Sequence, residues 1–406
     1  MTRSRSRAAN ARLESGDNAG LVIIRAGTFF GGTRLADQHV AERLVDLGVP
    51  VLYVDPPVSR MSPRNDPRLA AVLKEPVLRE VRPGLMRLTP RVPPAKSRGS
   101  IVHLTDFLVR RALKHSCADI GGNVRAVISV SARQPFGICN EGVRIFWARD
   151  DFVAGASLMN KPVGRVRRDE GRAADGADLI IAVSPSLFET WRSRGHRTVF
   201  VPNGCDVQGL ANVDAAEVPE DVALPPPVLG FVGTLGDRVD FRLLRALAAQ
   251  GRSLLLVGAR QKSFSLLGIS DLLDRPNVRW VGPKPYASLG SYLRTIDVGL
   301  VPYRDDVFNR ASFPLKMLEY LAAGRPVVSS DLPAARWLDT ALVRVARDQA
   351  EFPALVDEAV MEGTGPAWKS RRRVFAEGHS WSRRTEEILK AIEQTEIQSV
   401  TSREGA

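Results

Sequence analysis

Short apolar runs that alternate with helix-length segments constrain the fold of this chain more than any other feature. Each run has four to six residues, is rich in β-branched side chains and is bounded by Gly, Pro or Asp. Continuous apolar runs are typical of parallel strands buried on both faces, and the segments between them suit crossover helices. We expect strands at residues 21–26, 49–54, 126–130, 143–148, 178–183 and 197–202, and again at 228–232, 253–257, 278–281, 298–302, 326–330 and 342–346. The pattern predicts an α/β chain with two Rossmann-like domains.

A change in composition marks where the two domains join. Residues 208–227 are acidic, rich in small residues and end in three prolines, which is typical of a surface linker. We therefore expect a first domain over 19–207 and a second over 228–380. Residues 381–398 have helical periodicity and are predicted to cross back to the first domain. The Arg- and Ser-rich residues 1–18 lack the apolar stretch of a secretory signal, so we expect a disordered tail there.

The positive charge of the chain lies in its first half. The chain carries 57 Lys and Arg against 45 Asp and Glu, a net charge of +12. Residues 1–205 hold 32 basic and 19 acidic side chains, whereas residues 206–406 hold 25 and 26. Such a field attracts phosphate-bearing partners. Three widely spaced cysteines give neither a disulfide framework nor metal-ligand spacing, so we expect no metal and a cytoplasmic protein.

Two basic stretches indicate what this charge contacts. Residues 105–114 place Phe107 beside Arg110 and Arg111, which is typical of an amphipathic helix on an anionic membrane surface. A solvated helix face is the alternative. Residues 161–172 carry five basic and two acidic side chains without aromatics. Because no helix-turn-helix, zinc-ligand or base-stacking pattern accompanies them, the sequence does not predict a nucleic-acid partner.

The segment 309–330 has the marks of a helix that binds an anion. Ser312 is expected to cap a helix that begins near Phe313, with Pro314 in its first turn and Gly324 just past its end. The N-terminus of a helix that follows a strand favours a diphosphate, because free N–H groups and the helix dipole attract negative charge there.

Two charged residues on this helix are candidate ligand-binding groups. Lys316 and Glu319 are three residues apart and therefore share one face. The lysine can neutralise a phosphate, and the carboxylate can accept hydrogen bonds from the two hydroxyls of a ribose. An exposed Lys–Glu ion pair is the alternative.

Two glycine-containing loops follow predicted strands. Gly233 and Thr234 open a G-x-x-G turn in which the backbone can approach a phosphate, with Arg238 in reach. The turn lacks the third glycine of the dinucleotide fingerprint, which disfavours a nicotinamide oxidoreductase. Gly31 and Gly32 follow the first strand and leave room for a sugar or an acceptor phosphate. A plain strand–helix turn is the alternative for the loop that contains Gly233.

Asp150 and Asp151 follow the strand predicted at 143–148. They lie at the carboxyl edge, where open α/β sheets bind ligands. An aspartate there can act as a general base that deprotonates a hydroxyl acceptor. Adjacent carboxylates on an extended segment point to opposite sides, so we expect at most one of the two to serve, and a helix N-cap accounts equally well for the other.

Taken in order, these segments resemble the GT-B glycosyltransferases, in particular the family 4 type of bacterial cell-surface polysaccharide assembly. The resemblance covers about residues 20–395. It is carried by PLKMLEYLAAGRPVVSS (314–330) together with GFVGTLGDRVDF, NVRWVGPKPYASLGSYLRTIDVGLVPY, DLIIAVSPSL, VPNGCD and VDPP. It implies two Rossmann-like domains that face a central cleft, with a C-terminal helix crossing back to the first.

The resemblance also implies roles for individual residues in binding a nucleotide-sugar donor. Glu319 would bind the ribose. The other donor-binding residues implied are Ser312, Phe313, Pro314, Leu315 and Lys316 at the phosphate-facing turn, Gly233, Thr234 and Arg238 at the diphosphate, Gly282 and Lys284 beside the base, and Gly31 and Gly32 in the loop over the donor. Ala311 stands where the family usually has a glutamate, which leaves the stereochemistry of transfer open.

The resemblance and the residues together predict a metal-independent glycosyltransferase without a cofactor. It would move a sugar from a nucleoside-diphosphate sugar to a hydroxyl of a lipid-linked acceptor or a growing cell-envelope polysaccharide. Lys316 would stabilise the departing diphosphate, and Asp150 or Asp151 would be the base if the reaction inverts. We expect the first domain to contact the inner face of the plasma membrane peripherally. The alternatives are a non-catalytic GT-B-fold subunit of a polysaccharide assembly complex and a sugar-nucleotide epimerase.

Overall fold

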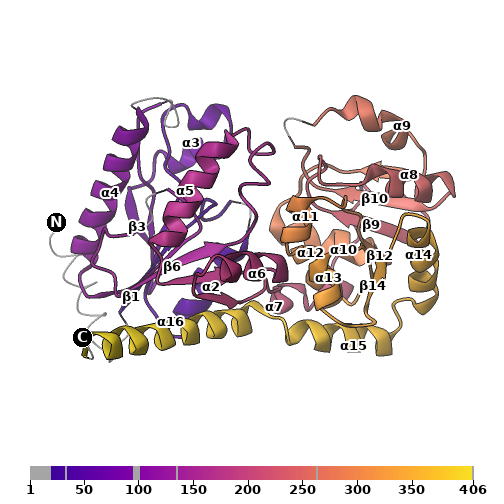
Figure 1. The fold of residues 1–406 in the computed structure, drawn as a ribbon. Coiled ribbons are helices and arrows are strands. Elements are labelled where there is room, and N and C mark those ends of the chain that lie inside the picture. Colours follow the sequence, from indigo (N-terminus) through magenta and orange to yellow (C-terminus); the bar gives the residue numbers. More distant parts are fainter. Residues whose placement is uncertain (1–19, 33, 95–100, 134–135, 262–263, 405–406) are drawn as a thin grey trace.

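The computed structural model describes residues 20–32, 34–94, 101–133, 136–261 and 264–404. Two α/β lobes lie side by side, each built on one sheet (Figure 1). The tail predicted at residues 1–18 lies outside the described residues. Within the described part of the chain, no helix is long and apolar enough to cross a membrane.

The first domain is built on an eight-stranded sheet in the order β3-β4-β2-β1-β5-β6-β7-β8. Its strands are β1 (Leu21–Arg25), β2 (Val51–Val54), β3 (Leu78–Arg82), β4 (Leu85–Leu88), β5 (Val124–Ser129), β6 (Val143–Ala148), β7 (Leu179–Ala182) and β8 (Thr198–Phe200). Its helices are α2 (Ala36–Asp46), α3 (Leu69–Val72), α4 (Ile101–Ile120), α5 (Val163–Asp175) and α6 (Pro185–Ser193), with the 3-10 turn η1 (Ser62–Arg64). All strand pairs are parallel except β3 with β4.

The second domain is built on a parallel six-stranded sheet in the order β11-β10-β9-β12-β13-β14. Its strands are β9 (Val228–Val232), β10 (Ser253–Val257), β11 (Val278–Trp280), β12 (Val298–Val301), β13 (Val327–Ser330) and β14 (Val343–Ala346). Its helices are α8 (Phe241–Ala249), α9 (Ser270–Leu273), α10 (Leu289–Thr295), α11 (Val307–Ala311), α12 (Leu315–Ala322), α13 (Pro333–Trp337), α14 (Glu351–Glu362) and α15 (Pro366–Glu377), with the 3-10 turns η3 (Leu266–Ile269) and η4 (Tyr286–Ser288).

All twelve strands predicted from the apolar runs are confirmed, within three residues at each end. The hairpin of β3 and β4 was not predicted. Its sequences LREVR and LMRL alternate apolar and charged residues, and β3 is half-exposed at the sheet edge. An edge strand that pairs on one side only does not have the continuous apolar run of a buried parallel strand.

Each sheet has one point where the chain changes direction across the strand order. In the second sheet the chain moves from β9 outward to β11 and then returns to β12 on the other side of β9. In the first sheet the corresponding neighbours are β1 and β5. Helices leave such neighbouring strands on opposite faces, which opens a crevice at their carboxyl ends, the usual ligand site of open α/β sheets. A ligand site is therefore expected at these two crevices.

Close backbone packing sets helix α12 directly on the second sheet. A Cβ at Gly299 would lie 2.3 Å from the ring of Tyr320, so the ring occupies the place of a side chain on β12. The Tyr320 hydroxyl donates a hydrogen bond to the carbonyl of Gly230 (3.1 Å) and accepts one from the amide of Val232 (2.8 Å). These contacts fix the height and rotation of α12 above β9 and β12, and so fix where its first turn points.

The segment between the domains is fastened to the second domain. It contains the end of α7 (Val207–Leu210) and the 3-10 turn η2 (Val213–Ala215). Asp214 forms ion pairs with Lys369 (2.8 Å) and Arg373 (2.6 Å) of α15. The last helix, α16 (Trp381–Glu404), runs back under the first domain, where it packs on α2 and extends beyond the predicted residue 398 (Figure 1).

Candidate functional site

The turn that leads into α12 differs from the one predicted. Asp306 accepts a hydrogen bond from the amide of Asn309 (2.7 Å) and thereby caps the short helix α11. Ser312 ends that helix, and α12 begins after Pro314 without a side-chain cap. The prediction that Ser312 caps α12 is therefore wrong, because an earlier aspartate starts a separate helical turn. Gly324 follows α12 with a φ of 77°, as predicted for a helix end.

The residues around Pro314 form a packed bend rather than an exposed turn. Phe313 is buried, and its carbonyl accepts a hydrogen bond from the Asn203 amide group (3.0 Å) of the first domain. Leu315 is half-buried at the start of α12. The bend is thus shaped by contact with the other domain, and it directs the next residue, Lys316, toward the sheet.

Lys316 places its ammonium group in the crevice at the carboxyl ends of β9 and β12. Its Nζ donates a hydrogen bond to the Tyr303 hydroxyl and lies 4.5 and 4.4 Å from the ring centroids of Phe231 and Tyr303. A Cβ at Gly233, the residue after β9, would lie 2.8 Å from this Nζ. Within the described residues the ammonium group has no carboxylate partner. It is therefore placed to bind an anion.

Arg238 adds a second positive charge to the same crevice. Its guanidinium donates to Asn309 Oδ1 (2.9 Å) and to Ser312 Oγ (3.0 Å) and lies 4.7 Å from the ring centroid of Tyr303. Neutral partners hold this side chain in place, and within the part of the chain that the structure describes it forms no ion pair with a carboxylate. Two cations on one crevice that are not held in ion pairs attract an anion with more than one charge.

Tyr303 stands between the two cations and was not predicted as a site residue. Burial raises the pKa of its hydroxyl, but the charges of Lys316 and Arg238 outweigh burial and hold the pKa below its usual range. The signal in the sequence was an aromatic residue directly after an apolar strand, in VGLVPY. Such a residue lies at the ligand-binding edge of a parallel sheet.

Glu319 lies one turn further along α12. It is half-buried and, among the described residues, its carboxylate has no hydrogen-bond donor. Burial raises the pKa of this carboxyl above its usual range and nearby Asp206 adds to the rise, while Lys316 opposes it. An open carboxylate at the rim of a positive crevice can accept hydrogen bonds from paired hydroxyl groups.

Asp150 and Asp151 have different surroundings. The side chain of Asp151 accepts a hydrogen bond from the Ala154 amide (2.8 Å), which closes the turn after β6. Asp150 lies near the second domain: burial raises the pKa of its carboxyl, while Arg238 and then Arg149 act in the opposite direction. The structure thus brings Asp150 to the cations of the crevice and uses Asp151 to hold the turn.

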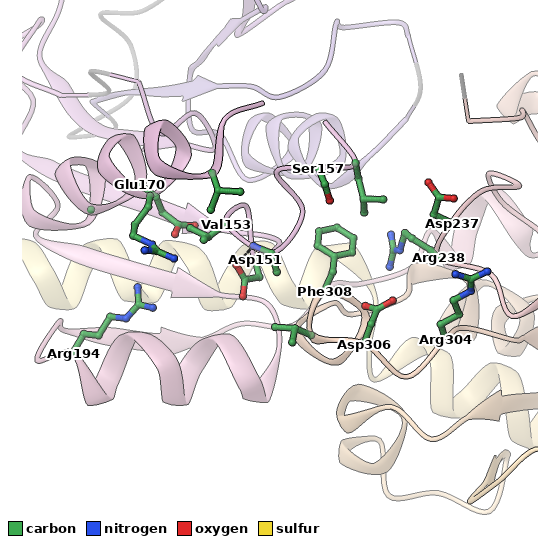
Figure 2. A pocket seen from close by; sticks show the side chains of 16 residues that line it. Asp151, Val153, Ser157, Glu170, Arg194, Asp237, Arg238, Arg304, Asp306 and Phe308 are labelled. Carbon is green, nitrogen blue, oxygen red and sulfur yellow. Dashed lines mark hydrogen bonds between the residues drawn. The ribbon is translucent and has the colours of Figure 1, made fainter. Parts of the chain in front are cut away.

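A cleft pocket of about 860 Å³ extends from this point between the domains (Figure 2). Glu170 and Arg194 line it from the first domain, and Arg304 and Phe308 from the second. Glu170 is buried, and burial together with the charge of Asp151 raises the pKa of its carboxyl to about 7. The sequence showed only a basic stretch at 161–172, because nothing local reveals which side of α5 faces another domain.

The loop that contains Gly31 and Gly32 is held by buried polar side chains of its own domain. Gln38 accepts a hydrogen bond from the Gly31 amide (3.0 Å), and the Gly32 amide donates to the carbonyl of Phe29 (2.9 Å). Asp55 accepts from the amide of Phe30 (2.9 Å). These amides therefore donate their hydrogen bonds within the first domain. Gly31 has a φ of 77° and open space beside its Cα, where a ligand could lie.

Three further predicted residues lie around the rim of the second sheet. Thr234 is exposed directly after Gly233. The carbonyl of Gly282 accepts a hydrogen bond from the Gly258 amide (2.9 Å). Lys284 forms an ion pair with Asp221 (2.6 Å), so its ammonium group holds the inter-domain segment.

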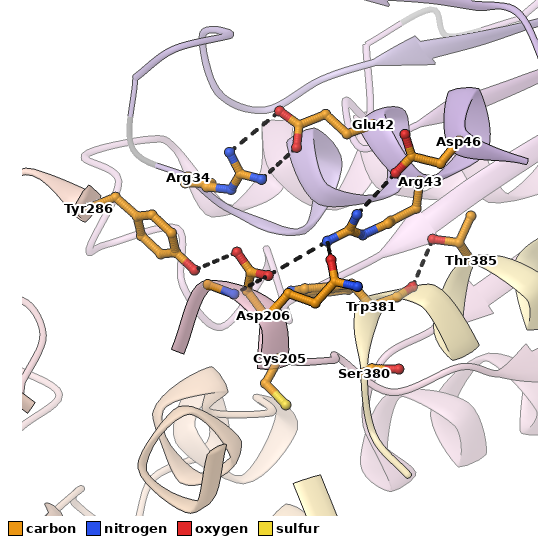
Figure 3. Close-up of polar contacts among 12 residues, drawn as sticks. Arg34, Glu42, Arg43, Asp46, Cys205, Asp206, Tyr286, Ser380, Trp381 and Thr385 are labelled. Carbon is orange, nitrogen blue, oxygen red and sulfur yellow. Dashed lines mark hydrogen bonds and ion pairs between the residues drawn. The ribbon is translucent and has the colours of Figure 1, made fainter. Parts of the chain in front are cut away.

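Polar contacts fasten the two domains to each other on one side of the cleft (Figure 3). Asp206 accepts a hydrogen bond from the Tyr286 hydroxyl (3.2 Å) and lies 3.6 Å from the guanidinium of Arg43 on α2. His39 of α2 stacks on Trp381 with 5.3 Å between ring centroids. The first residue of α16 thus packs where the domains meet.

Comparison with solved structures identifies the architecture. A sucrose-phosphate synthase from Thermosynechococcus elongatus superposes with a TM-score of 0.69 at 18% identity, over 92% of this chain and 98% of the other. A trehalose-6-phosphate protein from E. coli, bound with UDP-2-fluoro glucose, superposes with a TM-score of 0.63 at 13% identity, over 92% and 99%. The fold is GT-B.

Sequence comparison relates the second domain to glycosyltransferases. Residues 226–360 match the family model described as Glycosyl transferases group 1. This GT-B chain is also 32% identical over 168 residues to TuaH of Bacillus subtilis, provisionally named as a teichuronic acid biosynthesis glycosyltransferase. The match covers 40% of this chain and 42% of that relative, so it spans less than half the length of either. The matched residues 226–360 include all six strands of the second sheet, helix α12, and both Arg238 and Lys316.

Proposed function

We propose that this protein is a glycosyltransferase that takes a sugar from a nucleoside-diphosphate sugar bound at the β9–β12 crevice. One observation carries the proposal: Lys316 and Arg238, neither of them paired with a carboxylate in the described structure, meet at Tyr303, with Glu319 one turn further on. A dianionic diphosphate fits the two cations, and a ribose fits the open carboxylate. The match of this domain to a glycosyltransferase family model, and the UDP-2-fluoro glucose bound to a protein of the same fold, support this donor class.

The residues of the crevice account for departure of the diphosphate. Negative charge grows on the leaving diphosphate as the sugar bond breaks, so fixed cations stabilise the transition state more than the ground state. Lys316, Arg238 and the first turn of α12 supply this stabilisation, and we propose that no metal is required. Asp150, next to Arg238, is the base that deprotonates the acceptor hydroxyl if the reaction inverts. Activity that survives a chelator such as EDTA would support this proposal, and loss restored by Mg²⁺ would contradict it.

We further propose a lipid-linked or cell-envelope polysaccharide acceptor and a peripheral position on the inner face of the plasma membrane. Helix α4 supports this: Leu104 and Phe107 are 45% and 58% exposed, and Arg110 and Arg111 are exposed on the same helix. Apolar side chains among cations are typical of helices that lie on anionic membranes. The name of the Bacillus subtilis relative, which refers to a cell-envelope polymer, supports the acceptor class.

Calorimetric titration with UDP, GDP, ADP and dTDP tests the donor site. We expect one nucleotide to bind selectively, and Glu319→Ala to abolish most of that binding while the exposed Glu386→Ala control keeps it. Binding of none of the four would contradict the proposal and favour a non-catalytic subunit. Turnover of the matching nucleotide sugar without any acceptor, with the sugar changed and not released, would favour an epimerase.

Flotation with vesicles of phosphatidylglycerol and phosphatidylcholine tests the membrane surface. We expect Phe107→Ser to weaken vesicle binding, while Met361→Ser, at a position 79% exposed in the second domain, leaves it unchanged. A wild-type protein that stays unbound at physiological salt would contradict the membrane proposal without affecting the donor site.

A further inference from the structure

Two cysteines far apart in the sequence meet on the first domain. Cys117 lies in the last turns of α4, and Cys139 lies in the segment between β5 and β6. Their Sγ atoms are 2.9 Å apart, and both side chains are half-buried free thiols. A disulfide has a sulfur–sulfur distance of about 2.05 Å, so bond formation needs the sulfurs to approach by less than about 1 Å.

The turn that carries Cys139 is built to hold this thiol against α4. The Glu141 carboxylate accepts hydrogen bonds from the amides of Gly137 and Cys139, the latter at 3.1 Å. Gly137 and Asn140 adopt left-handed backbone conformations, with φ of 73° and 51°. Both cysteines also pack on the apolar cluster beneath α4, which includes Ile120 and Val124. The backbone of this turn therefore holds Cys139 beside α4.

We propose that Cys117 and Cys139 form a reversible thiol–disulfide pair that low-molecular-weight disulfides such as oxidised glutathione convert to an intramolecular disulfide. This site is independent of the proposed transfer reaction, because it lies under α4 on the first sheet and contains no residue of the β9–β12 crevice.

The reaction proceeds by two thiol–disulfide exchanges. The Cys117 thiolate attacks one sulfur of oxidised glutathione, the sulfur–sulfur bond breaks, and one glutathione leaves. Cys139 then loses its proton and attacks Cys117 Sγ, which releases the second glutathione. The protein loses two electrons and two protons, and one oxidised glutathione becomes two reduced ones. A hydrogen bond from Cys139 lowers the pKa of Cys117, which favours Cys117 as the first nucleophile.

Oxidation would fasten the end of α4 to the connection before β6. The new bond closes the chain between residues 117 and 139, which restricts the unfolded state. We expect the Tm of the first domain to rise by roughly 5 °C or more on oxidation and to return after reduction. Cys205 provides the internal comparison, since it is buried at 1% exposure and burial raises its pKa. It should remain a free thiol.

The test uses the whole 406-residue chain, fully reduced and then incubated with an excess of oxidised glutathione at neutral pH. After alkylation and trypsin digestion, mass spectrometry should detect peptide 115–125 joined to peptide 134–144, in wild type and in Cys205→Ser. Cys117→Ser should lack the joined pair. Wild-type protein in which both peptides carry free thiols, carry separate glutathione adducts, or are joined only between two protein molecules would overturn the proposal. The result for the wild-type protein decides whether the Cys117–Cys139 disulfide forms, even if a variant fails to fold.

Discussion

Replacing Lys316 by methionine removes the ammonium group of the crevice and keeps a side chain of similar length. The methionine would lie between the rings of Phe231 and Tyr303, where the lysine Nζ now lies 4.5 and 4.4 Å from the centroids. Sulfur–aromatic contacts are favourable, so we expect the variant to fold with a Tm close to that of the wild type. The substitution therefore tests the effect of the lysine charge on binding without a large change in side-chain packing.

The loss in nucleotide affinity follows from the position of this charge. A hydrogen bond between a charged donor and a phosphate contributes about 1.5–3 kcal/mol. Since about 1.4 kcal/mol corresponds to a tenfold change in Kd, the affinity for the preferred nucleoside diphosphate should fall about 10- to 100-fold. The value of kcat/KM for transfer should fall at least as far, because the charge on the departing diphosphate is greatest in the transition state.

Calorimetry on Lys316→Met and on Lys369→Met checks this magnitude. Lys369 is the matched control, since it forms an ion pair with Asp214 and lies beside Gly324, at the end of α12 opposite to the crevice. A Kd for Lys316→Met within twofold of the wild-type value would refute the assignment of the diphosphate to this crevice.

Three further changes test other parts of the structure. Gly233→Ala would place a methyl group 2.8 Å from the Lys316 Nζ, at a φ of 157° that a residue with a side chain rarely adopts, so calorimetry should show weaker nucleotide binding and the Tm should fall; undiminished affinity would mean that the ligand does not approach Gly233. Burial raises the pKa of the Glu170 carboxyl to about 7, so the folded protein holds this proton more tightly than the unfolded chain does. The resulting contribution to the free energy of unfolding is fully present below pH 4.5 and is lost as the pH rises to about 7. Urea unfolding should show a fall on the order of 3 kcal/mol over this range that Glu170→Gln lacks; parallel pH profiles would contradict it. Asp55→Ala removes the buried carboxylate 2.7 Å from Arg87, leaves that guanidinium with the partly exposed Glu75 (3.2 Å), and should cost on the order of 3 kcal/mol of unfolding free energy, against less than about 1 kcal/mol for the exposed Asp46→Ala. An equal cost for both would show that the Asp55–Arg87 pair is not a buried constraint.

The sequence predicts what depends on local pattern. The twelve predicted strands are rich in buried apolar residues, so continuous apolar runs reveal them. The edge hairpin of β3 and β4 contains charged residues and has no such run. Lys316 and Glu319 could be placed on one face because a helix brings residues three apart together. The cap by Ser312 was wrong because Asp306 starts a helical turn that the pattern of 309–330 does not contain.

Contacts between distant segments could not be predicted in this way. Tyr303 gains its role only where β12 lies beside β9, and Glu170 becomes a buried cleft residue only because α5 faces the second domain. Cys117 and Cys139 looked like unrelated thiols, since 22 positions separate them and only the folded first domain joins them. Residue type and spacing carry little information about contacts between segments that are distant in the sequence.

We expect a nucleoside diphosphate to bind at the carboxyl ends of β9 and β12. A crystal structure of the protein in complex with its preferred nucleotide tests this binding site. We expect phosphate oxygens within hydrogen-bond distance of Lys316 Nζ and Arg238, next to Gly233, with the ribose hydroxyls on the Glu319 carboxylate. A nucleotide bound elsewhere, with this crevice free of phosphate, would contradict it.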